Sequence, residues 1–170
     1  MDGGWSTRAE RGDDVTGVRA VNVAAFDTPA EADLVDALRA DPAWIDGLSV
    51  VSSDGPHGTP VGYALLTRCH IGATPALCLA PCAVLPERQR RGAGTAAIRA
   101  ALDAAAQLGE RFVVVLGHPG YYPRFGFGRA SAHGIRLSID VADEALMALA
   151  FDPADPLPAG TVRYAAPFGI

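Results

Sequence analysis

Apolar and polar positions follow two different periods along this chain, and the change from one to the other marks the expected elements. Near the N-terminus, apolar residues recur every three or four positions, which predicts one helix beginning at Asp13 and another over 29–40. Continuous apolar runs separated by turn residues follow at 48–52, 61–71 and 76–85. Because short turns join these runs, they predict three consecutive antiparallel strands.

The clearest helical pattern covers about 93–108, and a glycine follows it where a C-terminal cap belongs. The next run, Phe112–Leu116, is apolar without interruption and rich in β-branched residues, so it predicts a central strand covered on both faces. The succession of strand, loop, helix and strand between 77 and 116 predicts a right-handed crossover that joins parallel neighbours.

The two ends of the chain carry weaker patterns. They predict a strand near 5–8, two short closing strands at 134–139 and 160–165, and a short helix over 143–150. All of these elements fit into one domain over residues 1–170. The predicted fold class is therefore α/β, with a mixed, mostly antiparallel sheet of six or seven strands and helices on both faces.

Composition and charge narrow the range of partners. The formal net charge of −5 argues against a protein that coats DNA or RNA, so no nucleic-acid partner is predicted. No apolar run reaches the ~20 residues that a membrane span needs, so no membrane partner is predicted either. The first residues, Met1 to Trp5, lack the basic and apolar segments of a signal peptide, which favours a cytoplasmic location.

The three cysteines, Cys69, Cys78 and Cys82, are odd in number, and their spacing matches no zinc-binding pattern. All three lie in apolar, strand-like surroundings. We therefore predict no metal site, and we expect these residues to be reduced thiols buried in the fold.

The loop between the third apolar run and the helix over 93–108 carries the strongest chemical signal. Pro86 ends the strand, a loop with three arginines follows, and Gly92 and Gly94 open the helix. Such a loop turns backbone N–H groups toward one point, and the start of the helix adds partial positive charge there. The segment therefore predicts a binding site for a pyrophosphate.

Other nucleotide-binding patterns fit this loop less well. Residues 92–97 match the Gly-x-Gly-x-x-Ala fingerprint of dinucleotide-binding folds, but residues 86–91 separate the first glycine from the strand. The next strand leads into 117–119 without the carboxylate that would hold a ribose, and no Gly-Lys-Ser/Thr completes a P-loop. A glycine-rich connection with solvated arginines stays open as the plainest alternative.

Several segments resemble one known family. Residues 89–94, Gln-Arg-Arg-Gly-Ala-Gly, resemble the Gln/Arg-x-x-Gly-x-Gly/Ala signature of the GNAT superfamily of acyl-CoA-dependent N-acetyltransferases. Residues 83–86 are similar to its fourth strand, and 117–127 resemble its Tyr-x-x-x-Gly-Phe segment, in detail that of the YhbS-like group, as do 131–134. The resemblance implies a sheet splayed between its fourth and fifth strands and direct transfer of a short acyl group from acetyl-CoA to a primary amine.

For the cosubstrate, the resemblance implies a role for each part of this region. Backbone N–H groups of about 90–95 bind the pyrophosphate, and Gln89 fixes the loop. The backbone N–H of Cys82 polarises the acetyl carbonyl, and Val84 pairs with the pantetheine arm. The predicted cofactor-binding residues are Cys82, Ala83, Val84, Gln89, Arg90, Arg91, Gly92, Ala93, Gly94 and Thr95.

The resemblance also suggests catalytic residues. Tyr122 stands four residues before Gly126, at the place of the family's tyrosine, and a phenol with a pKa near 10 can protonate the leaving thiolate. His118, after the predicted fifth strand, is the candidate general base because an unperturbed imidazole has a pKa of about 6.5. Glu87 and water are the alternatives. The Cys82 thiol is a further catalytic candidate, as the nucleophile that would form an acetyl-enzyme, although the resemblance implies direct transfer without such an intermediate.

The acceptor is expected to be a small-molecule or peptide amine, which the sequence does not identify. Its site is predicted at the two early helices, their connection at 26–29 and the late loop around 128–134. Phe26 and Trp44 either line this site or pack in the core. The apolar tail over 162–170 suggests a homodimer interface. The alternative to an acetyltransferase is a protein without catalytic activity, an acyl-CoA-binding module that would have no need for Tyr122.

Overall fold

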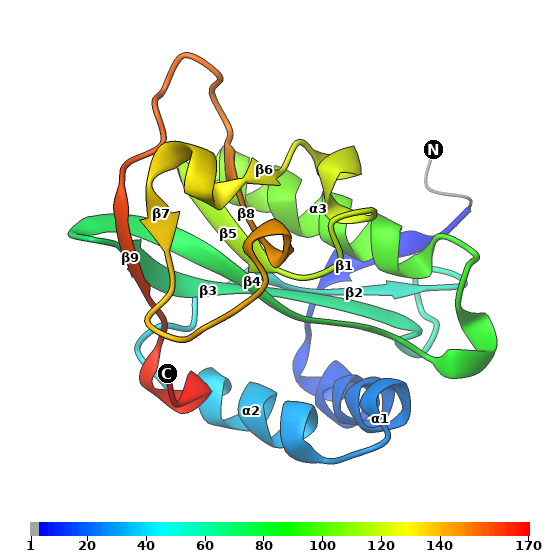
Figure 1. The fold of residues 1–170 in the computed structure, drawn as a ribbon. Coiled ribbons are helices and arrows are strands. Elements are labelled where there is room, and N and C mark those ends of the chain that lie inside the picture. Colours follow the sequence, from blue (N-terminus) through cyan, green and yellow to red (C-terminus); the bar gives the residue numbers. More distant parts are fainter. Residues whose placement is uncertain (1–3) are drawn as a thin grey trace.

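The computed structural model describes residues 4–170 and has three layers (Figure 1). A twisted sheet lies in the middle, with α1 (Val15–Phe26) and α2 (Ala30–Arg39) on one face and α3 (Ala93–Gln107) on the other. The predicted α/β class is confirmed. Within residues 4–170, no helix is long and apolar enough to cross a membrane. Residues 1–3, part of the segment behind the cytoplasmic prediction, lie outside the described residues.

The part of the chain that the structure describes contains nine strands, which pair mostly in antiparallel fashion. They are β1 Ser6–Ala9, β2 Ser49–Ser53, β3 Gly62–Ile71, β4 Thr74–Val84, β5 Phe112–Leu116, β6 Gly128–Arg129, β7 Ile135–Arg136, β8 Leu146–Ala150 and β9 Gly160–Arg163. Their order in space is β1-β2-β3-β4-β5-β8-β6, and β9 pairs with β3 and β7. Short 3-10 helices cover Gly12–Asp14, Pro86–Arg88, Tyr122–Phe125, Ala130–His133, Asp143–Ala145 and Ala166–Phe168.

One predicted element is wrong. The helix expected over 143–150 is instead the 3-10 turn Asp143–Ala145 followed by strand β8. The leucine, methionine and alanine residues of this segment favour a helix locally, which is why the sequence pattern misleads. In the fold, β8 pairs antiparallel with β5 along its whole length, and its first three residues are buried. Pairing with a distant strand therefore overrides the local preference.

β4 and β5 are parallel neighbours that stay together for only two residue pairs, Leu77 with Val113 and Cys78 with Val114. Beyond Cys78, β4 continues to Val84 and is paired with β3 alone. One edge of β4 is therefore left without a strand partner. This separation is the splay between the fourth and fifth strands that the family resemblance implies.

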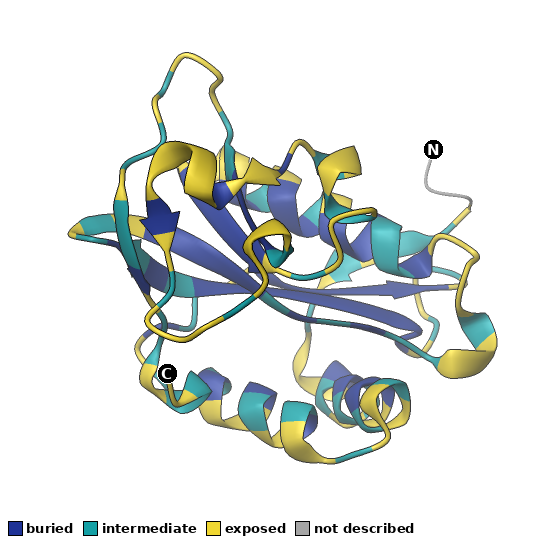
Figure 2. Cartoon of the chain, viewed as in Figure 1, coloured by how far each residue is buried: buried dark blue, intermediate teal, exposed yellow. Residues whose placement is uncertain are grey.

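Small residues let α3 lie close to the sheet. Its buried residues are Ala93, Ala96, Ala97, Ile98, Ala101, Leu102 and Ala105. A Cβ on Gly62 of β3 would lie 2.8 Å from the Ala93 carbonyl oxygen, which also accepts a 2.7 Å hydrogen bond from Ser52. Figure 2 shows the sheet and the inward helix faces buried and the outer helix faces exposed. This close contact determines where α3 begins and where the preceding loop must lie.

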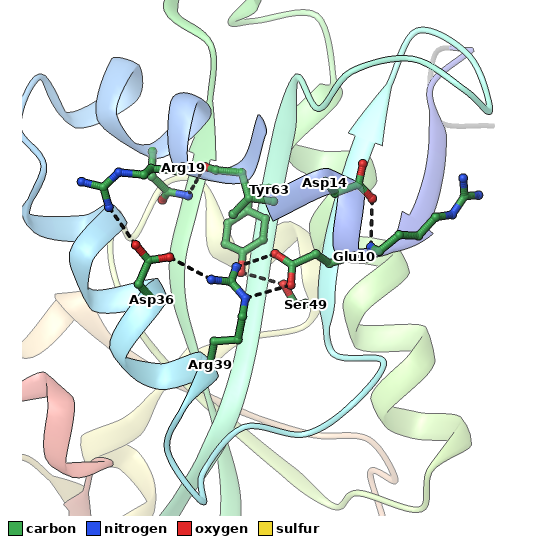
Figure 3. Close-up of polar contacts among 10 residues, drawn as sticks. Glu10, Asp14, Arg19, Asp36, Arg39, Ser49 and Tyr63 are labelled. Atoms are coloured by element: carbon green, nitrogen blue, oxygen red, sulfur yellow. Dashed lines mark hydrogen bonds and ion pairs between the residues drawn. The ribbon is translucent and has the colours of Figure 1, made fainter. Parts of the chain in front are cut away.

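A polar network holds α2 on the other face of the sheet (Figure 3). Arg39 donates hydrogen bonds to Glu10, the residue after β1, at 2.6 Å and to Asp36 at 2.8 Å. Next to it, the hydroxyl of the fully buried Tyr63 shares a 2.7 Å hydrogen bond with Ser49. The first contact joins α2 to the end of β1, and the last joins β2 to β3 beside it.

Replacing Gly62 by alanine is expected to destabilise the fold, because the new methyl group would press on the first turn of α3. Overpacking of this kind costs about 1–3 kcal/mol, which lowers Tm by about 2–10 °C for a chain of this size. Thermal unfolding followed by circular dichroism measures the effect. Gly55→Ala is the matched control, because a Cβ at Gly55 meets nothing within 4 Å. Equal melting temperatures for the two variants would contradict the packing argument.

Candidate active site

A cavity of about 670 Å³ opens beside the edge of β4 that β5 leaves free. Its wall comes from the end of α1, the second half of β4, the loop before α3, the first turns of α3 and the segment after β5. All but one of the predicted cofactor-binding residues line this cavity, namely Cys82, Ala83, Val84, Gln89, Arg90, Gly92, Ala93, Gly94 and Thr95. Arg91 is the exception.

The backbone of β4 presents two N–H groups to this cavity. The N–H of Leu85 donates to the carbonyl of Val61, just before β3, at 2.9 Å. Backbone N–H groups alternate in direction along a strand, so the N–H of Ala83 also faces β3, while those of Val84 and Cys82 face the opposite edge. Because β5 has already separated at that edge, these two donors face the cavity and not a strand.

The loop before α3 has two residues with positive φ, Arg90 at 64° and Gly92 at 90°. Glycine adopts this conformation readily, whereas arginine does so only against a steric penalty. The first helical hydrogen bond runs from the Ala96 N–H to the Gly92 carbonyl at 2.9 Å, so the N–H groups of residues 93–95 have no partner within the helix. These residues line the cavity, where free donors and the helix dipole favour an anion.

The opposite walls of the cavity meet at the first turn of α3. A Cβ on Gly94 would lie 2.8 Å from Cγ2 of Val84, so this position needs glycine for the helix to begin against β4. The Thr95 hydroxyl shares a 2.8 Å hydrogen bond with the Tyr121 hydroxyl. These contacts join β4, α3 and the segment after β5 around one space.

Tyr122 reaches the cavity because Gly117 leaves room for its ring, which a Cβ at Gly117 would overlap. The ring packs edge-on against Tyr121 and Phe127, with centroid distances of 5.1 and 6.1 Å. Burial raises the pKa of the Tyr122 hydroxyl, and the neighbouring Cys82 thiol raises it further. The phenol is therefore protonated at neutral pH and can act as a proton donor.

The Cys82 thiol is neutral for the same reason. Burial raises its pKa to about 12, and the Tyr122 hydroxyl offsets only part of that shift. Since the thiolate is the reactive form of cysteine, this environment suppresses nucleophilic chemistry at the sulfur. The side chain of Cys82 thus lines the cavity as a small apolar group beside the phenol.

His118 lies outside this cavity. Its side chain is exposed in the turn after β5, and Nδ1 accepts a hydrogen bond from the Gly120 N–H at 3.0 Å. The neutral ring therefore carries its proton on Nε2. Among the described residues that line the cavity, the charged side chains are Arg90 and Arg124, and no carboxylate is present. The structure thus does not bring the candidate base next to Cys82.

Arg124 is a lining residue that the sequence analysis did not single out. Its guanidinium carbon lies 4.3 Å from the centroid of the Tyr121 ring, and Nε donates to the Tyr121 carbonyl at 2.8 Å. The sequence did carry one indication that Arg124 lies at the site: it stands two residues after Tyr122, inside the segment that resembles the family motif. For Phe26, the alternatives were lining the site or packing in the core, and it lines the cavity. Trp44 instead lies against a separate cavity of about 330 Å³.

Sequence comparison relates the chain to one family. A sequence model of the acetyltransferase (GNAT) family matches residues 19–127. The chain is 38% identical to the uncharacterized N-acetyltransferase YjhQ of Escherichia coli K12 over 118 residues, which are 67% of this chain and 64% of that protein. The aligned part therefore spans a little less than two thirds of YjhQ.

Two of the solved structures that share this fold match it over nearly the whole chain. The GNAT family N-acetyltransferase YhbS from Escherichia coli, in complex with CoA, matches with a TM-score of 0.89 and 28% identity over 98% of this chain and 92% of that one. A GNAT family acetyltransferase from Brucella melitensis, in complex with acetyl-CoA, matches with a TM-score of 0.78 and 33% identity over 96% and 97%. The splayed sheet, the loop before α3 and these similarities agree, and the chain belongs to the GNAT family of acetyltransferases.

Proposed function

We propose that this protein transfers an acetyl or other short acyl group from acetyl-CoA to a primary amine, by direct attack in a ternary complex. The observation that carries the proposal is the continuity of one cavity. It runs from the unpartnered N–H groups at the start of α3 to the free edge of β4 and the Tyr122 hydroxyl. An anion-binding end and a proton-donating end in one space suit the thioester of a phosphate-bearing carrier.

Acetyl-CoA is proposed to lie along this cavity. Its pyrophosphate would accept hydrogen bonds from the N–H groups of residues 93–95, and Arg90 and Arg124 would supply positive charge. Its pantetheine arm would accept a hydrogen bond from the Val84 N–H, in the place that a neighbouring strand would otherwise take. The CoA complex of YhbS and the acetyl-CoA complex of the Brucella protein support this placement, because both folds match this one.

In the proposed reaction, the amine nitrogen attacks the thioester carbonyl carbon, and the carbonyl oxygen becomes an oxyanion as the C–N bond forms. The backbone N–H of Cys82 is the proposed donor to that oxygen, and one such donor is worth about 3 kcal/mol. The C–S bond then breaks, and Tyr122 gives its proton to the leaving thiolate. Of the two protons that an ammonium group loses, one ends on the CoA thiol through Tyr122 and the other in solvent.

Water is proposed to accept the first of these two protons, and the second passes to the tyrosinate that Tyr122 leaves when it protonates the thiolate in the cavity. The described residues that line it include no carboxylate, and the exposed ring of His118 can accept a proton only through intervening water. The amine would then enter in its neutral form. In this scheme the protein contributes positioning, the oxyanion donor and the acid, and the solvent contributes the base.

The acceptor is proposed to be a small-molecule or peptide amine that enters past the end of α1, where Ala25 and Phe26 line the cavity. The net charge of −5 favours the approach of a cationic amine over an anionic one. The homodimer and the cytoplasmic location stay predictions from the sequence.

Acetyl-CoA is expected to raise Tm. At a hundredfold excess over Kd, binding adds about 2.7 kcal/mol to the free energy of unfolding, which corresponds to roughly 5–10 °C for a chain of this length. Differential scanning fluorimetry measures the shift. NADH is the control, since it also carries a pyrophosphate but no thioester arm. Absence of a shift with acetyl-CoA, or an equal shift with NADH, would overturn the proposed cosubstrate.

The variant Tyr122→Phe is expected to lower kcat by about 10²-fold with little change in the Kd for CoA, because it removes the proton donor and keeps the ring. Release of free CoA thiol with a panel of primary amines measures the rate. Tyr164→Phe is the matched control: Tyr164 is also a half-buried tyrosine beside a cysteine, Cys78, but it does not line the cavity. Equal losses in both variants would contradict the acid role, and tight binding without turnover in the wild type would favour the non-catalytic module.

Direct transfer predicts that no acetyl group stays on the protein. Wild-type protein incubated with acetyl-CoA, without an amine, should keep its unmodified intact mass, because the Cys82 thiol is neutral at neutral pH. The variant Cys82→Ala should keep kcat within about tenfold, since the backbone N–H remains. An acetylated wild type together with an inactive Cys82→Ala variant would establish an acetyl-enzyme route instead.

A further inference from the structure

The loop before α3 is held from outside by a residue that the proposed reaction does not use. Trp5 lies immediately before β1 and is half-buried. Its indole N–H donates a 2.7 Å hydrogen bond to the carbonyl of Arg91, which is 86 positions away in the chain. A Cβ on Gly92 would lie 3.7 Å from the same indole nitrogen, so the ring rests directly against the peptide unit between Arg91 and Gly92.

This hydrogen bond determines the direction of the next N–H. The carbonyl of Arg91 and the N–H of Gly92 belong to one planar trans peptide unit and point in opposite directions. Because the carbonyl accepts from Trp5, the N–H of Gly92 points away from Trp5, and Gly92 itself lines the cavity. Glycine at a φ of 90° imposes little restriction of its own, so an external contact is needed to select one orientation of this unit.

A second contact fixes the same loop. The guanidinium carbon of Arg88 lies 5.2 Å from the centroid of the Trp5 ring, and Arg88 also forms an ion pair with Asp54 in the turn after β2. The indole therefore meets the loop at two points, a carbonyl by hydrogen bonding and a cation by its face. Both contacts lie on the outside of the loop and exist without a ligand.

We propose that Trp5 is a positioning residue that holds this loop in the shape that binds a pyrophosphate. The inference rests on the proposed function, because the pyrophosphate is that of CoA. A loop that is already in its binding shape loses less conformational freedom when the ligand arrives, which raises affinity. The effect is specific to the phosphate end of the ligand, since Trp5 contacts the loop and is not among the described residues that line the cavity with β4 and Tyr122.

Trp5→Phe tests this role because it removes the indole N–H and leaves an aromatic face for Arg88. The Kd for CoA, measured by calorimetry, and the KM for acetyl-CoA should both rise by about three- to tenfold, the range expected for one lost hydrogen bond. The kcat at saturating acetyl-CoA should stay within about twofold. With S-acetylpantetheine, which has no pyrophosphate, kcat/KM should be unchanged. A general loss of structure would lower it for both substrates.

Trp44→Phe is the matched control, because Trp44 also carries a stacked arginine, with the guanidinium carbon of Arg39 at 5.3 Å, and lies at a different cavity. This variant should bind CoA like the wild type. It also leaves Trp5 as the sole tryptophan of the chain. Because both loop contacts exist without a ligand, the emission maximum of Trp5 should stay the same when CoA is added, a measurement that does not depend on the folding of Trp5→Phe.

The outcomes separate this inference from the function it rests on. If wild-type protein binds no CoA, the proposed function fails. If wild-type protein binds CoA and Trp5→Phe binds it equally well, the function stands and the role of Trp5 is overturned. Equal losses with acetyl-CoA and S-acetylpantetheine, or a shift of the Trp5 emission maximum on CoA binding, would overturn it as well.

Discussion

β4 and β5 share two register pairs, after which β4 runs on to Val84 with one edge unpaired. Backbone N–H groups that face neither a strand nor water are costly, so such an edge is stable only if another partner satisfies it. Here the donors of Cys82 and Val84 open into a cavity that can admit both water and a ligand. The separation of two strands thus leaves two free hydrogen-bond donors in the middle of a sheet, and the other parts of the site lie around them.

Small residues bring those other parts close enough. Gly62 lets the start of α3 rest on β3, Gly94 lets the same turn rest on β4, and Gly117 makes room for the ring of Tyr122. None of these three positions requires a positive φ, so the reason for glycine is close approach and not backbone conformation. The geometry of the cavity is consequently determined by van der Waals contact at a few points, and one added methyl group at any of them would change it.

The two ends of the cavity differ in charge. Near the loop, Arg90, Arg124 and the start of α3 provide positive charge within a chain whose net charge is −5. At the other end, burial keeps the hydroxyl of Tyr122 and the thiol of Cys82 neutral, since it raises the pKa of both groups. An anionic group is attracted to one end, while proton transfer can occur in a less polar environment at the other. This division fits a ligand with phosphates at one end and a thioester at the other.

The local elements and the glycine-rich loop before α3 could be predicted from the sequence, because a 3.6-residue period, an apolar run and two glycines after a basic segment are properties of neighbouring residues. The family resemblance added the splay and the position of Tyr122. Strand β8 within 143–150 emerges from the folded structure alone, because the partner that overrides the helical preference of this segment is the distant β5. It alone placed His118 outside the cavity and Trp5 against the loop. Contacts between residues far apart in the chain depend on how whole elements pack, and no pattern among neighbouring residues records them.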